Sequence, residues 1–168
     1  MITATQLSMI RDVVTIFGVI AGFTYYVTNI REVRRNRRIT LTTTILKPFM
    51  TKEDISLMLV LLAMEWSSPE DFKNKYDHRT NPENCALRSS VWNTFETIGL
   101  LYRAGMLDSK TLTGGTAGII PALWYKFEPI IKKYREDDYA ENYYENFEYI
   151  GKRLQELHGL STDQLDSY

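Results

Sequence analysis

Few side chains in this sequence are suited to chemistry. The chain has two histidines, His78 and His158, and one cysteine, Cys85. Metal sites in proteins need several His, Cys or acidic side chains at short spacings, and neither histidine has such a partner four residues on. A single cysteine also excludes an internal disulfide. The sequence therefore predicts no metal site, and we interpret Cys85 as a small packing residue.

Two other patterns are weak candidates for binding or catalysis. Residues 113–118 (TGGTAG) precede a predicted helix, but they lack the Lys-Ser/Thr pair of a phosphate-binding loop and no strand precedes them. An enzyme based on carboxylates would need Glu65, Glu96 and Glu128 on facing helices, with Glu96 and Glu128 pointing inward. We predict a protein that is not an enzyme and holds no cofactor, with the carboxylate enzyme as a further hypothesis.

Composition and charge indicate what class of protein this chain forms. The chain has 168 residues, of which 44% are hydrophobic, with 20 Lys and Arg against 21 Asp and Glu. This length suits one domain, and this hydrophobic content excludes a disordered chain. Residues 31–38 contain five Arg and one Glu, whereas residues 136–168 contain two basic and nine acidic residues. The charge is therefore strongly asymmetric along the chain.

The first element is predicted to cross a membrane. Residues 13–30 carry no charge, and eighteen helical residues extend about 27 Å, just enough for a hydrocarbon core of about 30 Å. The arginines follow this segment, so the positive-inside rule places the C-terminal part in the cytoplasm and the first ten or so residues outside. A cleavable signal peptide would carry its positive charge before the apolar segment. The alternative is a buried helix of a soluble protein.

Two groups of residues in and just after this segment could contact other molecules at the membrane. Gly18 and Gly22 form a G-x-x-x-G pair, which lets a second helix approach closely in a bilayer. Packing on another helix and an incidental pair both remain open. The basic residues that would set the topology and bind anionic lipid headgroups are Arg31, Arg34, Arg35, Arg37 and Arg38. Their position beside the span explains them, so we predict no nucleic-acid partner.

After residue 38, the signals that mark the ends of secondary-structure elements are typical of helices. Thr51, Ser68 and Asn81 each occupy the position of a helix N-cap. Residues 55–66 are apolar on nearly every face, which predicts a central buried helix. Residues 39–46 are rich in β-branched side chains, and we expect a linker there, or a strand only if two chains pair.

Two more features complete the predicted fold. Pro129 should kink or split a helix that begins near Ile120. We expect an all-α protein, with a single N-terminal transmembrane helix followed by a small cytoplasmic bundle of about five helices. Its parts would be a membrane anchor with a basic extension over 1–38, a linker over 39–50, a helical cytoplasmic domain over 51–158 and a polar tail over 159–168.

The last predicted helix, about residues 141–157, is rich in acidic and aromatic residues. Acidic residues near a helix N-terminus stabilise its dipole, so a solvated face is the simpler interpretation. Exposed tyrosines beside charge also suit protein interfaces. In that hypothesis Phe147 lies in the core, and the docking face consists of Tyr144, Glu145, Glu148 and Tyr149.

Five segments together resemble a known family: EWSSPEDF at 65–72, NPE at 81–83, Trp124, KFEPII at 126–131 and YENFEY at 144–149. They are similar to an uncharacterised, largely archaeal group of small prokaryotic proteins with one membrane span and a helical cytoplasmic domain of unknown function. The resemblance implies the topology and the fold. It brings no catalytic residue, cofactor or substrate.

Two functions compete on this basis. The leading hypothesis is a membrane-anchored, non-enzymatic interaction protein, an accessory or scaffolding subunit of a membrane complex. Its partners would be membrane lipid and either another membrane protein or a second copy of the chain. The alternative is an anchored sensor domain that acts as a homo-oligomer and binds a small ligand or lipid beside Trp92, Trp124 and Phe127.

Overall fold

The computed structural model describes residues 4–49, 51–107, 109–110, 112, 114–137 and 139–166, without the side chains of residues 4, 7, 10, 38, 48, 115 and 166. Helices are the only regular elements in these ranges. The chain divides into two compact units, residues 1–41 and residues 42–168. The prediction of an all-α protein is confirmed for the described residues.

The first helix, α1 (Ala4–Leu46), continues well beyond the apolar segment, and a short 3-10 helix over Lys47–Phe49 follows it. Residues 39–46 of the expected linker over 39–50 are helical and continue α1, and they do not form a strand. A lone strand would leave its backbone groups without partners, whereas a helix satisfies them within the segment. Ile45 is buried in the second unit, and this packing outweighs the strand propensity of its neighbours.

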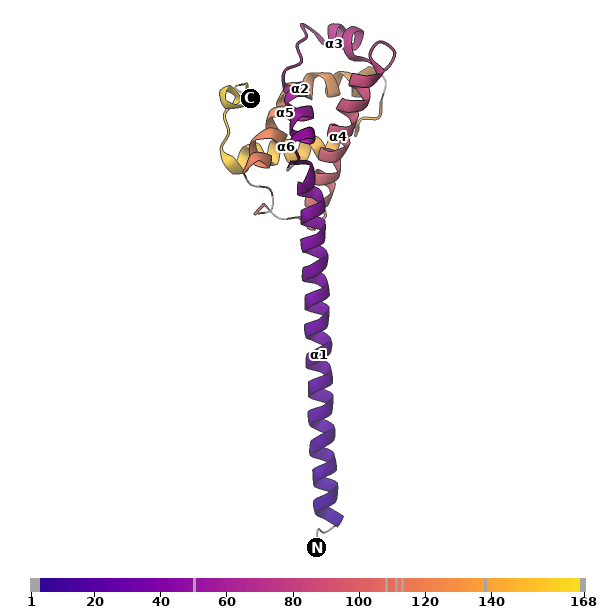
Figure 1. Cartoon of the computed structure of the whole chain (residues 1–168), viewed down its shortest axis with the longest axis vertical. Coiled ribbons are helices and arrows are strands. Elements are labelled where there is room, and N and C mark those ends of the chain that lie inside the picture. The colour runs from indigo at the N-terminus through magenta and orange to yellow at the C-terminus, as the bar shows by residue number, and fades with distance from the viewer. Residues whose placement is uncertain are drawn as a thin grey trace. The chain divides into compact units, whose positions relative to one another are not determined.

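Five helices of eight residues or more and one short helix follow in the described chain, and Figure 1 labels α2 to α6. In chain order they are α2 (Lys52–Leu62), α3 (Pro69–Tyr76), α4 (Pro82–Arg103), α5 (Gly115–Asp137), α6 (Glu145–His158) and α7 (Thr162–Asp166). The predicted number of about five helices matches α2 to α6.

Three of these helices begin where their N-caps predict. The side chains of Thr51 and Ser68 accept hydrogen bonds of 3.1 Å from the backbone N–H three residues on, and Asn81 accepts one of 3.0 Å. These bonds satisfy backbone donors that the first turn of a helix leaves free. The signals are local, which is why the sequence predicts them correctly.

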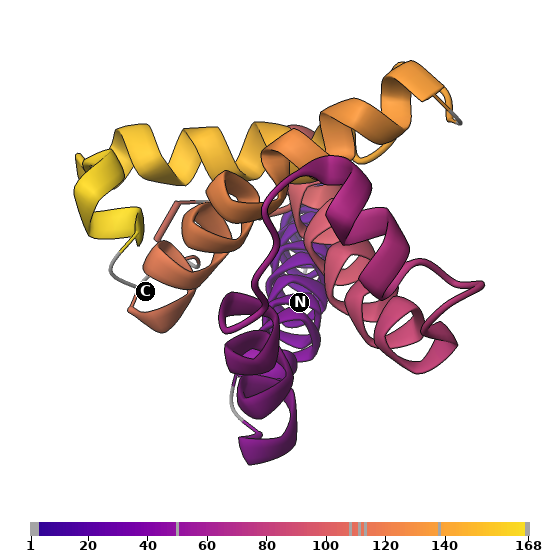
Figure 2. The ribbon, with the colours of Figure 1, turned by 90° about the horizontal axis from the view of Figure 1, so that it is seen from above.

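The core forms where α6 packs against α4 and α5 (Figure 2). Phe127 on α5 meets Phe72 and Trp92 edge to face, with ring centroids 6.0 and 5.2 Å apart. Two glycines bring the helices close. A Cβ atom on Gly99 would lie 2.0 Å from the backbone oxygen of Asn146, and one on Gly151 would lie 2.5 Å from Trp124 Cβ.

Helix α2 is not the central buried helix that its apolar sequence predicts. It ends at Leu62, and only Met58 and Leu61 of its residues are buried. Ile55, Leu59 and Val60 are exposed instead. An almost uniformly apolar run has no polar face to mark its outer side, so its composition does not reveal which side meets solvent.

Two predictions for the C-terminal half are also corrected. Pro129 lies inside α5 and does not split it, because buried side chains on both sides of the proline, among them Phe127 and Ile130, hold the helix in place. The polar tail expected over 159–168 contains α7 instead, and Leu165 of α7 is buried. Within the expected tail, the Gly159 helix end is confirmed, with a left-handed φ of 60°.

Candidate membrane anchor and docking surfaces

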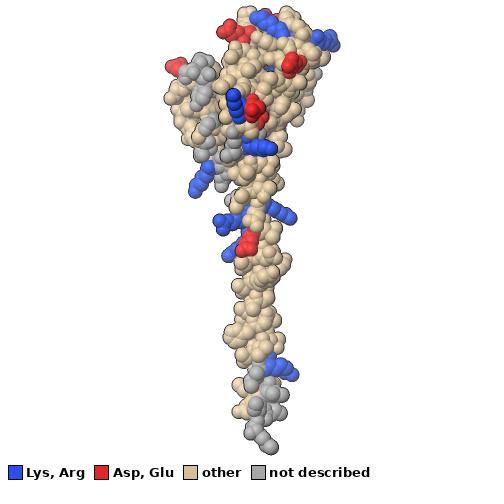
Figure 3. Space-filling view, viewed as in Figure 1, with Lys and Arg blue, Asp and Glu red and all other residues tan. Residues whose placement is uncertain are grey.

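Helix α1 is the one helix among the described residues that is long and apolar enough to cross a membrane. None of its most apolar window is buried within the protein. In Figure 3 an uncharged stretch separates a basic residue near the N-terminus of α1 from a group of basic residues further along it. Exposed apolar surface of this length is unfavourable in water and suits a lipid environment.

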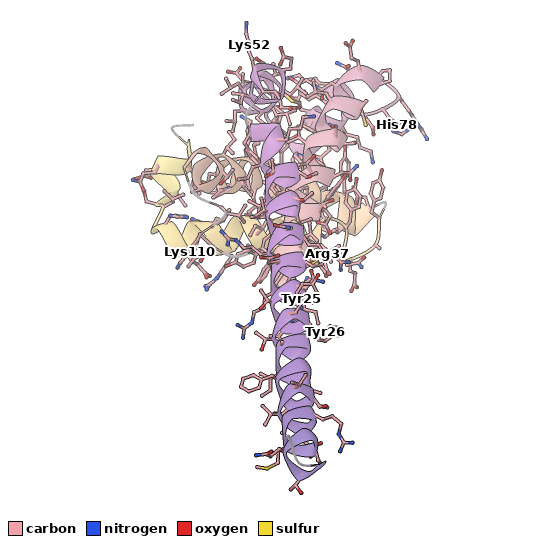
Figure 4. The ribbon with its side chains drawn as sticks, turned by 60° about the horizontal axis from the view of Figure 1, so that its bottom comes forward. Tyr25, Tyr26, Arg37, Lys52, His78 and Lys110 are labelled. Atoms are coloured by element: carbon pink, nitrogen blue, oxygen red, sulfur yellow. The ribbon has the colours of Figure 1, made fainter. Side chains whose placement is uncertain are left out.

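Polar side chains inside this segment are satisfied by the helix itself. The hydroxyls of Thr15, Thr24 and Thr28 each donate a 2.8 Å hydrogen bond to the carbonyl four residues earlier. Such bonds let hydroxyls lie in a bilayer without water. Figure 4 shows Tyr25, Tyr26 and Arg37 along the same helix.

The two glycines of the anchor are open. A Cβ on Gly18 or Gly22 would meet no atom within 4 Å. Arg31, Arg34, Arg35 and Arg37 are exposed along the same helix, whereas the side chain of Arg38 lies outside the described residues. The glycine pair and the arginines are therefore placed as expected on one continuous helix, with the Arg38 side chain excepted.

One member of the expected docking face is not at the surface. Tyr144 is only 8% exposed, its ring packs edge to face on Trp92, and its hydroxyl donates a 3.0 Å hydrogen bond to Asn93 Oδ1. The expectation that Tyr144 lies outside is wrong. Its backbone has a left-handed φ of 56°, which turns the ring into the core just before α6 begins.

The acidic residues of that face are paired within the domain. Glu145 lies 3.2 Å from Arg103, and Glu148 lies 2.6 Å from both Arg135 and Lys152. Burial alone would raise the pKa of Glu148, but the hydrogen bonds from Lys152 and Arg135 outweigh it and lower that pKa. These carboxylates are therefore neutralised by their neighbours and do not form an acidic surface.

A shallow hollow of about 420 Å³ lies over this region. Three acidic and three basic side chains line it together with Tyr149, which lies under Arg103 at 5.4 Å from the ring centroid. Equal numbers of opposite charges leave little net field to attract a charged partner. Tyr149 is exposed as predicted, so Glu145 and Tyr149 keep surface positions while Tyr144 does not.

The candidate catalytic carboxylates do not come together as one site. Glu96 accepts hydrogen bonds from the backbone N–H of Asn146 and Phe147, at 3.0 and 2.8 Å. Glu128 lies 2.9 Å from Lys132, and Glu65 is exposed. No group of three or more His, Cys, Asp or Glu able to hold a metal occurs among the described residues. Glu96 therefore has a structural role, as an acceptor at the start of α6.

The ligand site expected beside Trp92, Trp124 and Phe127 falls in the core. All three side chains are buried, and Trp124 packs edge to face on Phe147 with ring centroids 5.3 Å apart. The contact with Gly151 closes the other side of Trp124. No ligand site is assigned to these residues.

Sequence reasoning missed the surface that is most suited to a partner. Ile55, Leu59 and Val60 of α2 are 42%, 54% and 50% exposed. Ile55 and Leu59 are four residues apart and lie side by side on the helix, and Val60 lies about 100° further round it. We call these three residues the α2 apolar face. Contiguous exposed apolar side chains on a folded domain mark interaction sites. These residues belong to the apolar run over 55–66, which on sequence alone predicts a buried helix and not an exposed face.

Comparison with known proteins agrees with this anatomy. The family described as a domain of unknown function, DUF4760, matches residues 13–154. The chain belongs to the DUF4760 family. The match includes the uncharged segment of α1 and every helix from α2 to α5, together with most of α6. No curated protein and no solved structure matches the chain.

Membership in the DUF4760 family confirms the resemblance to an uncharacterised family and leaves the activity open. The family match continues from the apolar part of α1 into the helical domain. The apolar helix and the domain are therefore parts of one family unit, and a functional account of this DUF4760 protein must include both.

Proposed function

We propose that this protein is a single-pass, membrane-anchored, non-enzymatic interaction protein, an accessory subunit of a membrane complex. The unburied apolar segment of α1 supports the anchor, and the arginines that follow support a cytoplasmic position for the domain. Anionic lipid headgroups would bind these arginines. Gly18 and Gly22 offer a second helix a close approach within the bilayer.

The observation that carries the docking part of this proposal is the α2 apolar face. Its three large aliphatic side chains lie between the exposed Lys52 and Glu53 at the start of α2 and the exposed Glu65 just beyond its end. An apolar centre with a polar edge is the usual anatomy of a protein interface. Because the anchor holds the domain at the bilayer, the partner that fits is another membrane protein presenting an apolar helix face on the cytoplasmic side.

Substitution of Leu59 by glutamate is expected to release this partner. A charge placed in an apolar interface must be desolvated, which should weaken binding by about tenfold or more. The measurement is quantitative mass spectrometry of the proteins that co-purify with the tagged full-length chain after mild detergent extraction from its native membrane. A protein in stoichiometric amount with wild type should be lost with Leu59→Glu.

Leu100→Glu is the matched control. Leu100 lies on α4 and is 55% exposed, against 54% for Leu59, so both substitutions place the same charge at equally exposed helix positions. Leu100→Glu should retain the partner. The proposal is wrong if both variants retain it equally. A complex that contains only copies of this chain would instead favour the homo-oligomer.

The second candidate function is an anchored ligand-binding sensor. The filled core beside Trp124 gives it no support, but an open hollow elsewhere in the domain does. That hollow contains Arg88, a cationic side chain that is only 3% exposed. A buried cation without a carboxylate partner among the described residues is a specific reason to consider an anionic ligand.

A further inference from the structure

The hollow that contains Arg88 has a volume of about 560 Å³. Its walls come from the end of α3, the loop between α3 and α4, the first half of α4, the end of α5 and the turn before α6. A volume in this range is typical of small-molecule sites. All of these segments belong to the second compact unit.

Arg88 is buried in this wall with incomplete bonding. Its Nη1 donates a 3.1 Å hydrogen bond to the carbonyl of Tyr76, and its Nη2 contacts Cys85 Sγ at 3.6 Å. Its Nε has no hydrogen-bond partner in the parts of the chain that the structure describes. The guanidinium lies over the rings of Phe72 and Trp92, at 4.7 and 5.0 Å from their centroids. Within the described part of the chain, no carboxylate forms an ion pair with it.

A free N–H and an unbalanced charge in one buried side chain are costly. Buried guanidinium groups are usually paired with a carboxylate or a phosphate, often through two parallel hydrogen bonds. Ring faces, one carbonyl and a thiol supply only part of that stabilisation. An anion in the hollow would balance the charge of Arg88, although Nε itself is covered by protein atoms.

Other charges on the wall favour a doubly charged anion. Lys73 and Arg79 line the hollow with Arg88, whereas Asp77 contributes one carboxylate, whose Oδ1 lies 2.5 Å from the ring nitrogen Nδ1 of His78. Basic side chains therefore outnumber carboxylates on the wall by three to one. A phosphate monoester, with up to two negative charges and three terminal oxygens, matches this excess better than a single carboxylate.

Three tyrosines give the hollow an aromatic side. The rings of Tyr139 and Tyr143 are stacked, with centroids 4.2 Å apart and planes 14° apart, and Tyr134 lies 5.6 Å from Tyr139. Burial raises the pKa of Tyr134 and of Tyr143, so both phenols keep the proton that they would donate to an anion. Tyr139 is 49% exposed and offers ring surface for stacking.

We propose that this hollow binds a small phosphate monoester, with Arg88 holding the phosphate and the stacked tyrosines holding a planar group of the ester. The inference names the ligand of the second candidate function and rests on it, but it is independent of docking through the α2 apolar face. The phosphate could belong to a soluble ester or to a lipid headgroup such as that of phosphatidic acid. Both present a phosphate monoester to Arg88, but only a soluble aryl ester also brings a planar group to the tyrosines.

The test is a calorimetric titration of the full chain in phosphatidylcholine nanodiscs. Phenyl phosphate is expected to bind saturably, more tightly than inorganic phosphate and far more tightly than phenol. A second set of nanodiscs containing phosphatidic acid tests the lipid source, with competition by phenyl phosphate as the readout. Competition supports a lipid headgroup in the same site, and binding of phenyl phosphate alone supports a soluble ester. The proposal is overturned if neither phosphate ester binds.

Arg88→Met separates a binding role from a packing role. Loss of the guanidinium charge should weaken the binding of phenyl phosphate by about tenfold or more. The thermal midpoint of the free protein should be kept, because an unpaired buried charge is removed. If Arg88 only supports the Tyr76 carbonyl, the midpoint falls and phenyl phosphate binds equally well. That result would overturn the proposal.

A second pair of variants keeps the test valid if Arg88→Met does not fold. Arg79 is exposed on the rim of the hollow, and Lys110 is an exposed cation on the loop between α4 and α5. Figure 4 shows Lys110 far from His78, which lies next to Arg79 in the chain. Arg79→Ala should weaken the affinity for phenyl phosphate by about threefold or more. Lys110→Ala should leave this affinity unchanged. Equal affinity in both variants and wild type would exclude this site.

Discussion

Substitution of Gly99 by alanine is expected to destabilise the helical domain severely. The added Cβ would lie 2.0 Å from the backbone oxygen of Asn146 and 2.5 Å from its carbonyl carbon. Backbone atoms cannot turn away as a flexible side chain can, so α4 and α6 would have to separate. Forced overpacking of this kind costs about 3 kcal/mol or more, a large part of the stability of about 5–15 kcal/mol that is usual for a domain.

The measurement for Gly99→Ala is the circular dichroism of the full chain in detergent during thermal unfolding. The midpoint should fall by about 10 °C or more. Gly105→Ala is the control, because a Cβ there meets no atom within 4 Å and the substitution carries only the cost of a left-handed φ of 68°, about 1–2 kcal/mol. Equal midpoints for the two variants would contradict the close contact between α4 and α6.

Substitution of Glu96 by alanine should have the next largest effect. The carboxylate of Glu96 accepts from the backbone N–H of Asn146 and Phe147 and from Asn146 Nδ2, at 3.0, 2.8 and 2.7 Å. Tyr144 occupies the N-cap position of α6 and forms no side-chain cap hydrogen bond. Glu96, which lies on α4, therefore caps the N-terminus of α6. Its loss leaves donors at a buried helix start unpaired, at a cost of about 2–4 kcal/mol.

The readout for Glu96→Ala is the free energy of unfolding in urea, together with hydrogen exchange of the amides of Asn146 and Phe147. Both amides should exchange faster than in wild type. Glu83→Ala is the control, since Glu83 is an exposed acid in the first turn of the same α4 helix, worth about 0.3–1 kcal/mol. Unchanged exchange at the two amides in Glu96→Ala would show that the cap is supplied elsewhere.

The sequence predicts those parts of the fold that depend on neighbouring residues. The caps at Thr51, Ser68 and Asn81 act over three residues, and the uncharged segment of α1 is continuous. A local signal was also overlooked: Ser161 and Gln164 bond to each other's backbone N–H and form a capping box for α7. This pattern could have replaced the expected polar tail with a helix.

The features that sequence reasoning missed depend on residues far apart in the chain. Glu96 and Gly99 meet the start of α6 some fifty positions later, and no local pattern links them to Asn146. The acidic residues around Tyr144 favour a surface position for it, but a left-handed backbone directs it inward. The burial of Arg88 likewise comes from the tertiary fold. Periodicity gives a helix its faces, but the neighbours of each face come from the topology.

The central claim, a single membrane anchor with the helical domain in the cytoplasm, is tested most directly by site-specific labelling in intact cells. Thr5 near the start of α1 and Ser161 before α7 are both exposed, so each can be changed to cysteine in a Cys85→Ser background that has no other thiol. The account predicts that a membrane-impermeant maleimide labels Thr5→Cys in intact cells and labels Ser161→Cys only after permeabilisation. Labelling of Ser161→Cys in intact cells, or of neither variant before permeabilisation, would contradict it.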